Sequence, residues 1–145
     1  MILFLDFDGV LHSNYSDDEG LFCQTKLLWK ILRAIPKIEV VFSTSWREVH
    51  TLDEMVTFVT LGGGEDLVSR FIGVTPVLPY VGFYPRRDLE ITNWLEANGH
   101  TCQWLAIDDM PEFFNDGHPN LYAVDGGRGL TKSDVKLIIK RLLVK

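Results

Sequence analysis

Residues 2–10 read Ile2-Leu3-Phe4-Leu5-Asp6-Phe7-Asp8-Gly9-Val10, four consecutive apolar residues that run into two aspartates and a glycine. A short run that is apolar at every position is typical of a parallel strand covered on both faces. In open parallel sheets, functional side chains gather beyond the carboxyl ends of the strands. The pattern therefore predicts a central strand at residues 2–5, with Asp6 and Asp8 at its functional end.

The rest of the chain alternates between short apolar runs and helical patterns. Further strands are expected at residues 40–42, 104–107 and 121–124, with a short one at 71–74 inside a stretch from 67 to 81 that is otherwise loop. Helices are expected at 26–35, from Val49 to Val59, after a cap at Asp88 and after a cap at Thr131. This order predicts one α/β domain over residues 1–145, a doubly wound, Rossmann-like and mostly parallel sheet.

The composition excludes several classes of protein. The chain has 14 Lys and Arg against 20 Asp and Glu, a formal net charge of −6, which disfavours broad, charge-driven binding to nucleic acid or to anionic membranes. No stretch approaches the roughly 20 apolar residues of a membrane span, and no basic leader precedes the first strand. With two cysteines and no disulfide framework, we expect a cytoplasmic protein without a membrane partner.

Polar residues follow the other predicted strands as well. The strand at 40–42 runs into Ser43-Thr44-Ser45, and the strand at 104–107 runs into Asp108-Asp109. Taken singly these are ordinary strand-end turns or helix caps, but they coincide at one sheet edge. Four carboxylates gathered there repel one another unless a cation neutralises them, and Mg²⁺ prefers oxygen ligands. Since no Cys and His pattern has zinc spacing, the sequence predicts a magnesium site.

The spacing of Asp6 and Asp8 suggests the chemistry of this edge. Two aspartates at i and i+2 face one substrate if the extended conformation persists, so one can attack a phosphorus atom while the other protonates the leaving oxygen and later deprotonates water. A phosphoryl group also needs a hydroxyl or amide donor and a cationic side chain. Thr44 and an arginine are candidates for these two roles.

These motifs, in this order, resemble the haloacid dehalogenase-like (HAD) hydrolase superfamily. Thr44-Ser45-Trp46-Arg47 and Gly129-Leu130-Thr131 are similar to a compact branch, the HAD-like domains found attached to RNA repair proteins. The resemblance implies that Asp6 is the nucleophile and a Mg²⁺ ligand. It also implies that Asp8 is the general acid/base, with its backbone carbonyl on the metal, and that Thr44 binds phosphoryl oxygens. Because dehalogenases lack the second aspartate, Asp8 favours phosphate ester hydrolysis.

The resemblance assigns further residues. Asp109, with Asp108 beside it, would complete the metal ligands, and Arg86 or Arg87 stands where the family usually has a lysine. We favour Arg87 because of its spacing to Glu90-Ile91. Substrate contacts are expected from Ser45, Arg47 and Arg86 in addition to Thr44.

The chain leaves little room for the cap domain that larger members carry. Uncapped members tend to act on substrates too large to enclose, so the expected partner is a phosphorylated molecule, with a macromolecule or a nucleic acid end included. The expected function is a Mg²⁺-dependent phosphatase. The alternatives are a polynucleotide end phosphatase and a catalytically silent module that binds a phosphorylated ligand. The sequence names neither the substrate nor the oligomeric state.

Overall fold

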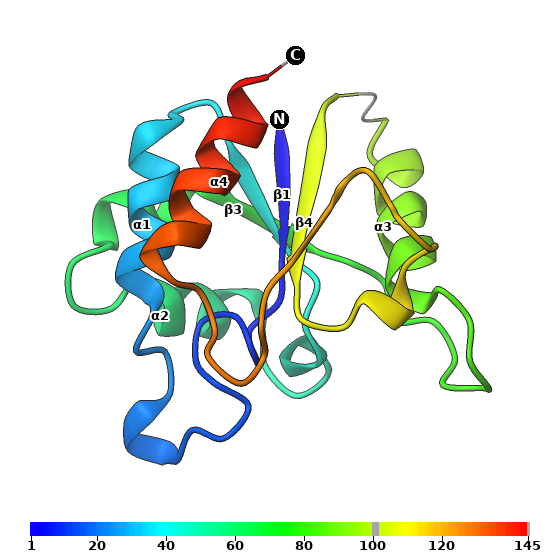
Figure 1. The fold of residues 1–145 in the computed structure, drawn as a ribbon, viewed down its shortest axis with the longest axis horizontal. Coiled ribbons are helices and arrows are strands. Elements are labelled where there is room, and N and C mark those ends of the chain that lie inside the picture. Colours follow the sequence, from blue (N-terminus) through cyan, green and yellow to red (C-terminus); the bar gives the residue numbers. More distant parts are fainter. Residues whose placement is uncertain (100–101, 145) are drawn as a thin grey trace.

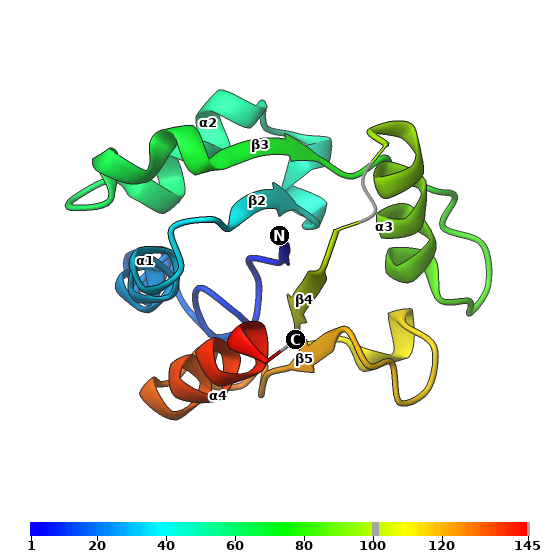
Figure 2. The same cartoon turned by 90° about the horizontal axis from the view of Figure 1, so that it is seen from above.

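The computed structural model describes residues 1–99 and 102–144 and is built around one sheet of five parallel strands. The strand order is β3-β2-β1-β4-β5, and helices cover both faces (Figures 1 and 2). The strands are β1 (Ile2–Leu5), β2 (Glu39–Phe42), β3 (Phe71–Val74), β4 (Trp104–Asp108) and β5 (Leu121–Ala123). The predicted doubly wound α/β fold is thereby confirmed, including the short strand at 71–74.

Within the described residues, four α-helices and four short 3-10 helices accompany the sheet. The α-helices are α1 (Thr25–Ala34), α2 (Leu52–Thr60), α3 (Arg86–Ala97) and α4 (Lys132–Leu143). The 3-10 helices are η1 (Asp18–Gly20), η2 (Ser45–Glu48), η3 (Glu65–Arg70) and η4 (Pro111–Phe113). Between β1 and α1 the chain forms only η1 and loops, and between β3 and α3 it forms the loop 75–85, which projects at the lower right of Figure 1. Neither connection forms a cap domain.

Alternate residues of β1 divide the apolar core into two layers. Leu3 and Leu5 pack with the buried residues of α1, α2 and α4 on one face of the sheet, whereas Ile2 and Phe4 pack with α3 on the other. Successive side chains of a strand point to opposite faces, so a strand covered on both sides must be apolar throughout. This is the reason for the continuous apolar run at the start of the chain.

The register around β1 determines what lies at the carboxyl edge. Leu5 pairs with Phe42 of β2 on one side and with Ile107 of β4 on the other. The next residues along these three strands are Asp6, Ser43 and Asp108. Parallel pairing therefore places them side by side at the edge that lies at the bottom of Figure 1.

Two helix starts differ from the sequence-based expectation. α2 begins at Leu52 after a reciprocal cap between Thr51 and Glu54, and Val49 lies outside it with 78% of its surface exposed. The predicted cap at Asp88 is wrong, because α3 already begins at Arg86. Asp88 is buried in the first turn, and its carboxylate accepts hydrogen bonds from the backbone and side chain of Asn115. The predicted Thr131 cap of α4 is confirmed.

The helices were also compared with the requirements for crossing a membrane. Within residues 1–99 and 102–144, no helix has the length and apolar character that crossing a membrane requires.

Candidate active site

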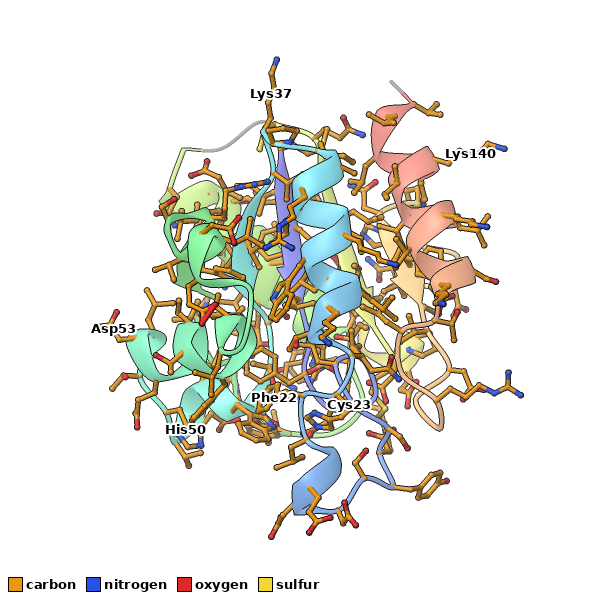
Figure 3. All side chains as sticks on the ribbon, turned by 90° about the vertical axis from the view of Figure 1, so that its left-hand side faces the viewer. Phe22, Cys23, Lys37, His50, Asp53 and Lys140 are labelled. Atoms are coloured by element: carbon orange, nitrogen blue, oxygen red, sulfur yellow. The ribbon has the colours of Figure 1, made fainter. Side chains whose placement is uncertain are left out.

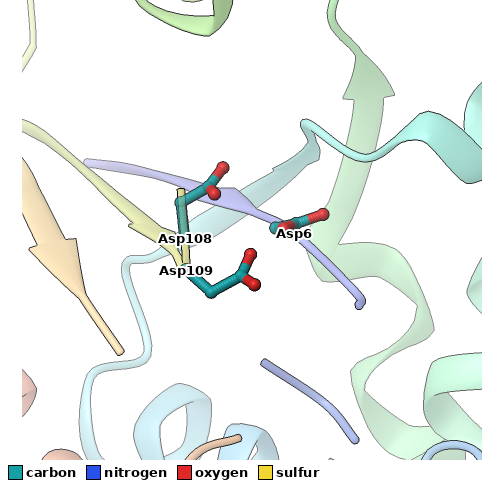
Figure 4. Close-up of side chains that lie close together, drawn as sticks. All are labelled: Asp6, Asp108 and Asp109. Carbon is teal, nitrogen blue, oxygen red and sulfur yellow. The ribbon is translucent and has the colours of Figure 1, made fainter. Parts of the chain in front are cut away.

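Three carboxylates meet at the carboxyl edge of the sheet. One oxygen from each of Asp6, Asp108 and Asp109 lies within 4.8 Å of the other two (Figure 4). Asp6 follows β1 directly and Asp108 ends β4, so both belong to the buried centre of the sheet, while Asp109 is partly exposed. The structure thus brings together three of the four predicted carboxylates.

Arg87 is the cation that faces this group. From the first turn of α3, its Nη1 lies 2.9 Å from Oδ2 of Asp6 and 2.6 Å from Oδ2 of Asp108. The neighbouring Arg86 points elsewhere, so of the two arginines Arg87 is the one that reaches the carboxylates. The other oxygen of Asp6 accepts a hydrogen bond from the backbone N–H of Phe7.

Burial and mutual repulsion shift the proton affinities of this group. Burial, followed by the charge of Asp108, raises the pKa of Asp6 well above its usual range, although Arg87 acts in the opposite direction. Burial likewise raises the pKa of Asp108 to about 6. Burial alone would lower the pKa of Arg87, but the two carboxylates more than offset it and the pKa is raised. One guanidinium therefore does not fully compensate the negative charge, and a further cation would be stabilised here.

The residues present fit a Mg²⁺ ion. The cluster offers carboxylate oxygens only, which suits a hard cation. Oδ2 of Asp109 accepts a hydrogen bond from Nδ2 of Asn14 at 2.8 Å and lies against two glycines. A Cβ atom would stand 2.3 Å from this oxygen at Gly9 and 2.5 Å from it at Gly126. Both glycines are thus needed for the backbone to approach the carboxylate this closely.

Asp8 lies outside the three-carboxylate group. Its half-exposed side chain accepts hydrogen bonds at both oxygens, from Nε2 of His12 at 2.8 Å and from Nε1 of Trp46 at 3.1 Å. The hydrogen bond from His12 is the largest of the effects that lower the pKa of Asp8. The structure thus separates the carboxylate of Asp8 from those of Asp6, Asp108 and Asp109, and leaves it half-exposed to solvent.

The tautomer of His12 follows from its second hydrogen bond. Nδ1 accepts the backbone N–H of Phe22 at 3.2 Å, so the proton of the neutral ring resides on Nε2, which donates it to Asp8. Phe22, labelled in the lower half of Figure 3, has a left-handed φ of 60°, and its ring packs on Trp46. His12 was not among the site residues predicted from the sequence. Its distance of four residues from Asp8 was the available signal, because a single turn brings the two together.

The hydroxyl residues after β2 occupy three different environments. Thr44 is buried and its Oγ1 accepts the backbone N–H of Trp46, which caps η2, while Ser45 is exposed. Ser43, which is next to Asp6 by register, was not among the predicted site residues. Its buried hydroxyl has no hydrogen-bond partner within the described part of the chain. Its position directly after the strand was the signal that could have identified it.

Two arginines predicted to bind substrate are held in internal contacts. Nη2 of Arg47 lies 2.9 Å from Glu90, and its guanidinium also donates to the carbonyl oxygens of Thr44 and Thr75. With its side chain only 3% exposed, Arg47 joins the ends of β2 and β3 to α3 instead of facing solvent. Arg86 is also buried, between two aromatic rings described below.

A parallel sheet whose central strand is followed by Asp6-Phe7-Asp8, with the carboxylate pair Asp108-Asp109 at the end of β4, defines a hydrolase domain of the HAD type. Comparison with protein families matched residues 2–135 to the HAD domain in Swiss Army Knife RNA repair proteins, and the chain belongs to this family. No match was found among curated proteins or among solved structures.

Proposed function

We propose that this HAD domain is a Mg²⁺-dependent phosphatase that hydrolyses phosphomonoesters through an aspartyl-phosphate on Asp6. The observation that supports it best is the contrast between the surroundings of Asp6 and those of Asp8. Asp6 lies among carboxylates and Arg87, in a setting suited to a cation and a phosphoryl group, whereas Asp8 is two residues away, open to solvent and free of the cluster. A nucleophile and a separate acid/base need these two environments.

In the first half of the reaction, a carboxylate oxygen of Asp6 attacks phosphorus and the bond to the leaving alcohol oxygen breaks. Asp8 gives its proton to that oxygen. In the second half, Asp8 takes a proton from water, the water oxygen attacks phosphorus, and Asp6 is released with inorganic phosphate. Asp8 is held ionised in the free protein, so its role as an acid requires that the substrate phosphate raise its pKa by like-charge repulsion.

The remaining groups of the site would bind Mg²⁺ and the phosphoryl group and offset their charges. Asp6, Asp108 and Asp109, with the backbone carbonyl of Asp8, would bind Mg²⁺, which supplies positive charge that offsets the repulsion between phosphate and carboxylates. Arg87 offsets part of the negative charge of Asp6 and Asp108. Thr44 and Ser45 are candidates to donate hydroxyl hydrogen bonds to phosphoryl oxygens. Ser43 joins them because it follows β2 next to Asp6 in the register and its buried hydroxyl has no partner among the described residues.

A polynucleotide end phosphatase is the narrower version of this function. The description of the matched family, which refers to RNA repair proteins, favours it. The connections around the site add to the argument, since neither forms a cap that would enclose the substrate. A cytoplasmic protein that meets phosphorylated substrates, including nucleic acid ends, remains our expectation for localisation and partners.

The test is hydrolysis of p-nitrophenyl phosphate by purified protein with Mg²⁺ and after chelation. We expect turnover only with Mg²⁺, and loss of turnover in a folded Asp6→Asn variant. Asp53→Asn is the matched control, because Asp53 is an exposed residue of α2 that points away from the protein (Figure 3). Metal-independent turnover, or an active Asp6→Asn variant, would contradict the mechanism. A folded wild type that binds phosphate without turnover would identify a silent binding module.

A further inference from the structure

A pocket lies beside the first turn of α3, the turn that also carries Arg87. It has a volume of about 240 Å³ and is lined by Tyr80, Gly82, Phe83, Tyr84, Arg86 and Phe113. We refer to these six residues as the aromatic pocket. Pockets for drug-sized ligands measure about 300–1,000 Å³, so this one suits a single flat ring system. Four of its six residues are aromatic, and the fifth side chain is a cation.

Arg86 fixes the inner wall of the aromatic pocket. Its Cζ atom lies 3.7 Å from the ring centre of Tyr80 and 4.9 Å from that of Phe113, and the residue is buried. The Tyr80 hydroxyl in turn donates to the carboxylate of Glu48. Tyr80 is therefore held in place from both ends although 59% of its surface is exposed. A ring that is already immobilised loses little entropy when a ligand stacks on it.

The outer wall is an exposed aromatic side chain. Phe83, in the loop 75–85, is 99% exposed, and Val81 two residues earlier is 69% exposed. Exposed apolar groups that cluster at one place on the surface of a soluble protein mark a binding site more often than isolated ones do. Within the described residues, Phe83 has no aromatic or cation–π partner.

The aromatic pocket is connected to the carboxylates through consecutive residues. Arg86 lines the pocket, whereas Arg87 contacts Asp6, and Phe113 lies against both, with the Cζ atom of Arg87 5.7 Å from its ring centre. A ligand that occupies both places must carry a phosphate and a flat ring with a π face. A nucleotide with a terminal phosphate meets this description.

We propose that the aromatic pocket binds the nucleobase of a nucleotide whose terminal phosphate lies at Asp6. This inference rests on the proposed function, because it takes the phosphate to be the reacting group. Stacking tolerates any base, since every base has a π face. The net charge of −6 disfavours a long strand bound through its phosphates, so recognition is confined to the terminal nucleotide.

The test compares phosphorylated probes with and without a base, and with the phosphate at two positions. We would titrate adenosine 5′-monophosphate, adenosine 3′-monophosphate and ribose 5-phosphate into the wild type, and measure turnover of each with Mg²⁺. A 3′-phosphorylated tetranucleotide and its counterpart with an abasic terminal residue distinguish a strand end from a free nucleotide. Phe83→Ala is the test variant, since a fully exposed side chain can be removed without loss of folding. Leu143→Ala, an exposed apolar residue near the end of α4, is its control.

We expect the base to strengthen binding about tenfold, and Phe83→Ala to remove that gain while leaving the affinity for ribose 5-phosphate unchanged. Equal affinity for probes with and without the base, or a Phe83→Ala variant that retains the gain, would overturn the proposal. Because binding is measured separately from turnover, a protein that hydrolyses every phosphate alike refutes the pocket and retains the phosphatase. A protein that binds the probes with a base more tightly but shows no turnover retains the pocket and refutes the phosphatase.

Discussion

Asp6 and Asp8 stand two residues apart on the same turn, yet their surroundings shift their pKa values in opposite directions. Asp6 is buried beside Asp108, and burial is the main cause of its raised pKa. Asp8 is half-exposed and receives a hydrogen bond at each oxygen, chiefly that of His12, which lowers its pKa. Identical side chains therefore acquire different chemistry from their neighbours. The proposed roles require the opposite protonation states, so Mg²⁺ would have to lower the pKa of Asp6 and the substrate phosphate would have to raise that of Asp8.

The largest effect should come from removing the cation on the Asp6 side. Replacing Arg87 by Met leaves two buried carboxylates without their partner, and the free energy of unfolding at pH 8 without metal should fall by about 3–5 kcal/mol. Urea unfolding measures it. Arg33→Met is the control, since the Arg33–Asp66 pair at 2.8 Å is exposed and screened by solvent, so its loss should lower the free energy of unfolding far less. Similar losses in both variants would show that the buried pair is not special.

The second largest effect should be the stabilisation by Mg²⁺, which should depend on the carboxylate of Asp109 and not on that of Asp8. At a concentration about 100 times its Kd, Mg²⁺ should stabilise the wild type by about 2.7 kcal/mol, seen as a rise in Tm. Asp109→Asn should remove this rise, while Asp8→Asn should retain it because the backbone carbonyl remains. An undiminished rise in Asp109→Asn would place the ion elsewhere.

The stability of the metal-free protein should depend on pH through Asp108. The pKa of Asp108 is raised to about 6 in the folded protein, so ionising it costs stability that is fully present below about pH 4. Without metal, the contribution of Asp108 to the free energy of unfolding should therefore decline between about pH 4 and pH 6. Urea unfolding at a series of pH values measures this decline. A free energy of unfolding that stays constant across the interval would argue against a raised pKa of Asp108.

The smallest effect concerns the Asp8 side. His12→Phe and Trp46→Phe each delete one hydrogen bond, so the pKa of Asp8 should rise toward about 3.9, more in the first variant, at a cost of about 1 kcal/mol. Because the folded pKa is lowered, this stability is present above about pH 4 and is lost as the pH falls through the folded value. NMR titration of the carboxyl carbon without metal measures the shift. An unchanged pKa in His12→Phe would show that the hydrogen bond is not its cause.

The fold and the edge of the sheet that carries the site were predictable because they depend on local patterns. Continuous apolar runs and helical stripes predicted the strands and helices, and parallel strands necessarily align their carboxyl ends. Helix starts were less predictable. Asp88 resembles a cap in sequence but is buried against Asn115, a contact from 27 residues away.

The sequence by itself determined a parallel α/β sheet with Asp6, Asp108 and Asp109 at one edge, since residue type and strand order suffice for that. Only the tertiary structure decided which arginine faces the carboxylates, which one is buried against Glu90, and that His12 holds Asp8. These outcomes depend on where long side chains from separate elements end. The physical reason is that charge interactions and hydrogen bonds act over a few ångströms, and distances of that size are set by packing rather than by spacing along the chain.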